Sequence, residues 1–160
     1  MKSDDMDSSP NPAISVSEIV SQTVGQVVSR IDGLYGGAVS IHLGPMLPGR
    51  RRDKGSWIVT VWGADLFIDG VPADDGSDAA TGSTLRPDVQ QFAGQRVVEA
   101  SVVLGTLELQ LAFESGNTIR LVPDASFDGD AWTLTLPSGR TLCVNSDGDW
   151  SLKSEEALQQ

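Results

Sequence analysis

The sequence is short of the residues on which most enzyme active sites and metal centres are built. It contains one cysteine, Cys143, and one histidine, His42, among 160 residues. A Ser-His-Asp or Cys-His catalytic site would have to use His42, and a structural zinc site needs several Cys or His ligands. We therefore expect no catalytic residues, no metal and no cofactor.

The sequence also lacks the features of exported and membrane proteins. A single cysteine cannot form a disulfide within the chain, which is usual for proteins of a reducing compartment. No run of apolar residues approaches the length of about 18 that a membrane-spanning helix needs. Residues 1–7 are acidic and polar, without the apolar stretch of a secretory signal. We therefore expect a cytoplasmic protein without a membrane partner.

Basic residues are scarce, because 11 Lys and Arg stand against 22 Asp and Glu, which gives a net charge of −11. This charge repels the phosphate backbone of nucleic acids and attracts basic proteins. We expect a protein partner and no nucleic acid. Arg50, Arg51 and Arg52 form the one concentrated basic segment. They are interpreted either as a solvated loop tip or as a contact for an acidic patch, on a partner or on a second copy of the chain.

The composition divides the chain into two similar halves between polar ends. Residues 1–12 lack core-forming residues and are expected to be a disordered tail, and residues 153–160 a frayed tail. Residues 69–86 are rich in Asp, Gly and Ala, as in a flexible linker. Residues 13–68 and 87–152 remain as two candidate β-meanders.

Within each half, apolar residues recur at every second position, the pattern of a strand with one buried face. In the first half, Val39, Ile41 and Leu43 alternate with Ser40 and His42. We therefore expect His42 to point outward and to be exposed. The same alternation occurs in the second half, at Leu107, Leu109, Leu111 and Phe113.

The two halves also follow the same order of motifs. A Gly-Gln pair at residue 25 corresponds to one at residue 94, and the strand opened by Trp57 corresponds to the strand opened by Trp132. A single short meander buries too little apolar area to be stable alone, whereas two facing meanders bury both apolar faces.

We therefore predict a mainly β fold of two pseudo-symmetric antiparallel β-meanders, packed as a sandwich or half-barrel. Two short helices are expected, one within residues 14–24 and one at residues 87–93. Trp57 and Trp132 are predicted core residues related by an approximate two-fold axis.

Other chemistries have weak support in the sequence. Asp65, Glu99 and Glu108 are acidic residues on strands, but no spacing singles out a pair for glycoside hydrolysis. Clusters of Asp with Gly, such as residues 145–149, lack the bidentate glutamate of a calcium loop and are typical of tight turns. Cys143 lies between apolar residues and is interpreted as a buried hydrophobe.

Five short segments within residues 14–152 carry a family resemblance. They are Gly37-Ala-Val-Ser-Ile-His-Leu-Gly44, Gly55-Ser-Trp57, Asp65-Leu-Phe67-Ile, Phe113-Glu-Ser-Gly-Asn-Thr-Ile119 and Asp130-Ala-Trp132. The pattern resembles an uncharacterised bacterial family of small two-repeat β proteins, similar to immunity proteins of toxin systems. This chain departs from it at Ser56, where the family has an acidic residue, and at Phe67, where tryptophan is usual. The resemblance implies an inhibitor of a basic toxin or effector.

The leading hypothesis is a non-catalytic protein-binding module, of the immunity or antitoxin-like type, that occludes a basic site on its partner. Tyr35 and Trp62 are aromatic residues that we expect at the binding surface. The alternative is a β-sandwich that binds a small ligand or carbohydrate by stacking on Tyr35, Trp62 or Trp150. A second alternative is an enzyme that uses acidic residues, such as Asp147 and Asp149.

Overall fold

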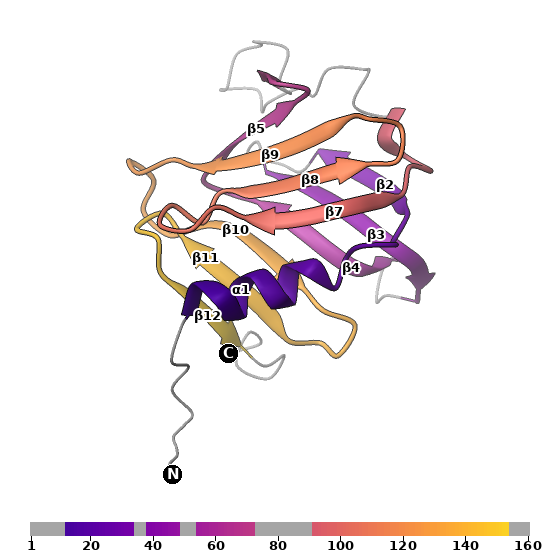
Figure 1. Ribbon diagram of the computed structural model, residues 1–160. Helices are drawn as coiled ribbons and strands as arrows, with labels where there is room; N and C mark the ends of the chain where they lie inside the picture. The colour runs from indigo at the N-terminus through magenta and orange to yellow at the C-terminus, as the bar shows by residue number, and fades with distance from the viewer. Residues whose placement is uncertain (1–11, 34–37, 49–53, 73–90, 154–160) are drawn as a thin grey trace.

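The computed structural model describes residues 12–33, 38–48, 54–72 and 91–153, which form two antiparallel β-sheets and one short α-helix (Figure 1). The mainly β fold is therefore confirmed. The inward side chains of both sheets belong to one hydrophobic core, so the sheets pack face to face in a sandwich-like arrangement. No helix in these ranges is long and apolar enough to cross a membrane.

The larger sheet has six strands in the order β12-β11-β10-β4-β3-β2. Its strands are β2 (Val28–Gly33), β3 (Val39–Leu47), β4 (Lys54–Val61), β10 (Asp130–Thr135), β11 (Thr141–Asn145) and β12 (Trp150–Lys153). The smaller sheet has five strands in the order β6-β5-β9-β8-β7. Its strands are β5 (Ala64–Ile68), β6 (Val71–Pro72), β7 (Val97–Val102), β8 (Leu109–Phe113) and β9 (Thr118–Pro123).

The prediction of two facing meanders required each half of the chain to form one sheet. The structure differs, because each half contributes strands to both sheets. The first half places β2, β3 and β4 in the larger sheet and then continues into the smaller sheet as β5 and β6. The second half places β7, β8 and β9 in the smaller sheet and continues into the larger sheet as β10, β11 and β12. Each half thereby covers the strand edges that the other would leave open at β4 and β9.

The predicted relation between the two tryptophans is wrong. Trp57 on β4 and Trp132 on β10 lie in the same sheet, on neighbouring strands, with Trp132 opposite Val61. Counted within its half, β4 is the third strand and β10 the fourth, so the two residues do not occupy equivalent places. Both are buried in the core, as predicted.

One helix, α1 (Pro12–Ser21), packs against β7 at the opening between the sheets. Val16 and Val20 are fully buried and lie one turn apart on the same helix face. Most of the second predicted helix, residues 87–90, lies outside the described residues. The described remainder includes only a short helical turn at residues 91–92, from which Phe92 packs edge to face against Phe113.

Trp132 joins the two sheets at the centre of the core. Its side chain is fully buried, and its indole Nε1 donates a hydrogen bond of 3.0 Å to the carbonyl oxygen of Leu107. Leu107 precedes β8 of the other sheet and has a backbone φ of 62°, in the left-handed region that leucine rarely adopts. The indole therefore stabilises a strained turn of the facing sheet as well as filling the core.

We predict that Trp132→Phe lowers the free energy of unfolding by about 2–4 kcal/mol, because it removes a buried hydrogen bond and leaves a cavity. Trp150→Phe is the matched control, since Trp150 lies half-buried at the start of β12, and it should cost about 1 kcal/mol or less. Urea denaturation followed by circular dichroism measures both. Equal losses would contradict a special role for the bond to Leu107.

Candidate functional site

The outer face of the larger sheet carries two rows of mostly polar side chains. The cross-strand register alternates these residues with those that enter the core. One row is Arg30, His42, Ile58, Thr135, Thr141 and Lys153, and the other is Asp32, Ser40, Thr60, Thr133, Cys143 and Ser151.

His42 lies on this face as predicted, but the expectation that it is exposed is wrong, since its exposed fraction is 5%. Its Nδ1 accepts a hydrogen bond of 3.0 Å from the backbone N–H of Gly55. Its Nε2 lies 3.4 Å from Oδ2 of Asp32 and 3.2 Å from Nη2 of Arg30. Gly55 can approach His42 this closely because glycine has no Cβ. A Cβ at this position would lie only 2.8 Å from Cβ of His42.

These contacts favour a structural role for His42. Because Nδ1 accepts a hydrogen bond from a backbone N–H, the ring proton is assigned to Nε2, which faces the carboxylate of Asp32. A general base needs a ring nitrogen that can reach a substrate. Both nitrogens of His42 are engaged within the protein. The sequence pattern gave the correct face, but it could not show that β2 and Gly55 cover the ring.

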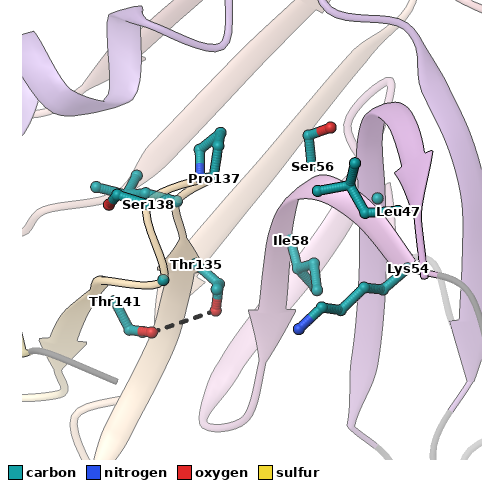
Figure 2. A pocket seen from close by; sticks show the side chains of 11 residues that line it. Leu47, Lys54, Ser56, Ile58, Thr135, Pro137, Ser138 and Thr141 are labelled. Carbon is teal, nitrogen blue, oxygen red and sulfur yellow. Dashed lines mark hydrogen bonds between the residues drawn. The ribbon is translucent and has the colours of Figure 1, made fainter. Parts of the chain in front are cut away.

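A groove of about 380 Å³ lies at one end of the same face (Figure 2). Leu47 and Lys54 form one wall, and the turn after β10 forms the other, with Pro137 and Ser138. Its floor includes the side chains of Ile58, Thr135 and Thr141. This site could not be predicted from the sequence, because its residues come from strands that are far apart in the chain.

The groove exists because β4 and β10 pair over only part of their length. They are paired from Ile58 to Val61 on β4, so Lys54–Trp57 have no strand beside them on the groove side within the described residues. Pro137 has no backbone N–H with which to extend the ladder. The chain turns back there, where the N–H of Gly139 bonds the carbonyl of Leu136 at 2.9 Å.

The outer face of the smaller sheet carries an ion pair beside a shallow depression of about 220 Å³. Nε and Nη2 of Arg120 lie 2.8 Å and 3.3 Å from the carboxylate oxygens of Glu108, and Gln110 donates to the same carboxylate at 2.7 Å. The guanidinium also lies 5.7 Å from the ring centre of Phe67. Glu99 lines the depression, whereas Glu108 is not among its lining residues.

A third site lies where both halves of the chain pass from one sheet to the other. Trp62 and Phe127 have exposed fractions of 52% and 41% and line a depression with Asp128 and Asp130. The ring of Phe127 lies directly on the backbone of Gly63, where a Cβ would come within 2.0 Å of its Cδ2. We refer to Trp62, Phe127, Asp128 and Asp130 as the aromatic patch.

The aromatic patch contains one of the residues expected at the binding surface. Trp62 is exposed and has an aromatic neighbour that the sequence analysis missed. The sequence feature that could have indicated this neighbour is Phe127 itself, a large apolar residue within the mostly polar segment Asp124–Asp130. Tyr35, Arg50, Arg51 and Arg52 lie outside the described residues. Trp150, the other candidate for stacking, is half-buried and packs against the core.

The Asp-Gly segments that the structure describes are turns. In residues 145–149, Oδ1 of Asn145 accepts hydrogen bonds from the backbone N–H groups of Asp147 and Asp149, at 2.9 Å and 3.1 Å. Across the described ranges, no group of three or more His, Cys, Asp or Glu residues could hold a metal ion. Cys143 is buried, and burial, assisted by the charge of Asp130, raises the pKa of its thiol. A neutral buried thiol is a poor nucleophile.

We predict that the Glu108–Arg120 pair stabilises the fold at neutral pH and not in acid. The hydrogen bond from Arg120 lowers the pKa of Glu108, and this effect exceeds the opposing effect of burial. A carboxyl group whose pKa is lower in the folded than in the unfolded state stabilises the fold when it is ionised. This stabilisation is fully present above the ordinary glutamate pKa of about 4.3, and it is lost as the pH falls through the lower pKa of the folded protein.

Thermal unfolding of Glu108→Gln from pH 7 to pH 3 measures this effect. The melting temperature should be lower than that of the unchanged protein at pH 7, and the difference should shrink as the pH falls. Glu99→Gln is the matched control, because Glu99 lies on the same face and forms no ion pair with a described residue. A difference that is constant with pH would contradict the prediction.

The comparisons with known proteins add no relative to these observations. No family model, no curated protein and no solved structure matches this chain. The resemblance to the two-repeat bacterial family therefore stays a prediction, and the function has to be argued from the three sites.

Proposed function

We propose that this chain is a non-catalytic protein-binding module whose docking surface is the aromatic patch. The observation that carries the proposal is the exposure of Trp62 and Phe127 side by side, at 52% and 41%. Tryptophan is among the residues that contribute most to protein interfaces, because it buries a large area with few rotatable bonds. Large apolar side chains gathered on a surface mark sites of interaction.

The backbone beneath the patch is firmly held, which lowers the entropy lost on binding. The N–H groups of Trp62 and Gly63 both donate to the carbonyl of Ala131, at 2.9 Å and 3.0 Å. The N–H of Asp124 donates to the carbonyl of Gly63 at 2.9 Å. The loop that carries Phe127 is thus fastened to the segment that carries Trp62.

The charge around the aromatic rings favours a basic partner. Asp128 and Asp130 line the same depression, and the whole chain has a net charge of −11. An arginine of the partner could stack on the indole of Trp62 and pair with a carboxylate at the same time. The long-range field would also speed the encounter with a basic protein. An immunity or antitoxin-like inhibitor of a basic toxin or effector would work in this way.

Carbohydrate binding is the second candidate, because an exposed indole beside carboxylates can also stack on a sugar. It is less favoured, since Trp150 is half-buried and does not widen the platform. An enzyme based on Asp147 and Asp149 has less support still, because both residues belong to the turn organised by Asn145.

We infer that the predicted repeat is real but is exchanged between the sheets. The support is the order of strands, because each half begins with a three-stranded meander in one sheet and then crosses to the other. Under this interpretation β4 corresponds to β9 and β5 to β10. The two crossings then meet at Gly63 and Asp124, beneath the aromatic patch.

We predict that a basic protein binds the aromatic patch in a 1:1 complex. The test is capture from a lysate of the native cells, identification of the bound protein, and titration of the purified pair by calorimetry. Trp62→Ser should weaken binding about 30-fold or more, as expected for a central tryptophan. Asp128→Asn with Asp130→Asn should reduce the association rate at low salt, with less effect at high salt.

Val24→Ser is the matched control, because Val24 is 44% exposed in the turn after α1, where Gly25 bonds Val97 at the start of β7, and it does not line the patch. It should leave the affinity unchanged. A captured partner that is acidic, or that Trp62→Ser does not weaken, would overturn the proposal. A response of Trp62 fluorescence to simple sugars, without a protein partner, would favour the carbohydrate alternative.

A further inference from the structure

The groove on the larger sheet has the opposite electrostatic character to the rest of the chain. Acidic residues outnumber basic residues by 22 to 11 in the sequence, yet none of the eleven residues that line the groove is acidic. Lys54 is its one charged residue, and it forms no ion pair with any residue of the described ranges. A positive groove in an acidic chain points to a negatively charged ligand.

The uncharged residues of the groove favour a carboxylate on a small apolar group. Figure 2 shows the Lys54 side chain reaching over the floor toward Thr135 and Thr141, whose hydroxyl oxygens lie 3.4 Å apart. Thr141 is 5% exposed, and this long contact is a weak hydrogen bond for a buried hydroxyl. Leu47 and Pro137 face each other as apolar walls above these polar groups.

The strand at the groove's edge favours a peptide over a free acid. Lys54–Trp57 of β4 pair with β3 on one side, and on the groove side they have no strand beside them within the described residues. An extended peptide can bind to such an edge through its main chain, while pockets receive alternate side chains. The volume of about 380 Å³ is within the range of small-ligand pockets and suits a few residues.

We propose that the groove binds the carboxyl terminus of an extended peptide. The terminal carboxylate pairs with Lys54 and the threonine hydroxyls, and the last side chain, a small apolar one, lies between Leu47 and Pro137. The main chain of the peptide runs along Lys54–Trp57. This site is separate from the aromatic patch, because Lys54 and Trp62 lie at opposite ends of β4, about 26 Å apart at about 3.3 Å per residue.

Titration of the ¹⁵N-labelled full chain with short peptides tests the proposal. The probe is an acetylated Gly-Ser-Ala-Val tetrapeptide with a free carboxyl terminus, compared with the same peptide as its carboxamide and with N-acetylvaline. The free-acid peptide should shift the amide signals of Ser56, Ser138 and Thr141. The carboxamide should bind at least tenfold more weakly, because it lacks the charge that Lys54 pairs with.

Lys54→Gln should weaken binding of the free-acid peptide about tenfold or more. Lys153→Gln is the matched control, since Lys153 lies on the same sheet face opposite Thr141 but does not line the groove, and it should change the affinity less than twofold. Trp62→Ser should have no effect, so this test is independent of the proposed protein-binding function.

Three results would overturn the proposal. Equal loss of affinity in Lys54→Gln and Lys153→Gln would show a general charge effect without a site. Equal binding of N-acetylvaline and the tetrapeptide would show that the strand edge does not contribute and that the ligand is a small acid. Absence of shifts at Ser56, Ser138 and Thr141 with all three probes would show that the groove binds no carboxylate of this kind.

Discussion

The pairing between β4 and β10 determines the position of both proposed binding sites. It covers only Ile58–Val61 on β4, and it joins a strand of the first half to a strand of the second half. At the Val61 end, the chain crosses to the other sheet at Trp62 and Gly63, and this crossing exposes the aromatic patch. At the Ile58 end, the strands separate and the groove opens between them. A longer ladder would have closed the groove, and a shorter one would have left the crossing without support from Ala131.

The exchange of strands also explains why the core is continuous. If each half formed its own sheet, β4 and β9 would both be open edges, and open edges invite aggregation. Pairing β5 with β9 and β10 with Ile58–Val61 of β4 covers most of these edges and places apolar side chains of both halves on each inner face. Trp132 links the two sheets, because its side chain fills the core from one sheet and donates a hydrogen bond to Leu107 of the other. A single side chain therefore couples the packing of both sheets.

The sequence was sufficient to predict which side chains of a strand face the core, but it was insufficient to predict which distant strands pair. Alternation at Val39, Ile41 and Leu43 correctly placed the core face of β3, because neighbouring side chains of a strand must point to opposite sides. The same pattern cannot reveal which distant strand lies next to it, so the relation of Trp57 to Trp132 was wrong. It also cannot show what covers the outer face, so the burial of His42 was missed. The aromatic patch and the groove both depend on pairings between distant strands and could not be located beforehand.

The distribution of charge gives the two proposed sites opposite chemistry. The aromatic patch combines indole and phenyl rings with Asp128 and Asp130, whereas the groove combines Lys54 with hydroxyl groups and has no acidic lining residue. A partner that is basic at one contact and ends in a carboxylate at another could bind both sites only if it spanned the length of β4. Two separate partners would face no such requirement, and the rigid sheet between the sites would keep their binding energies independent.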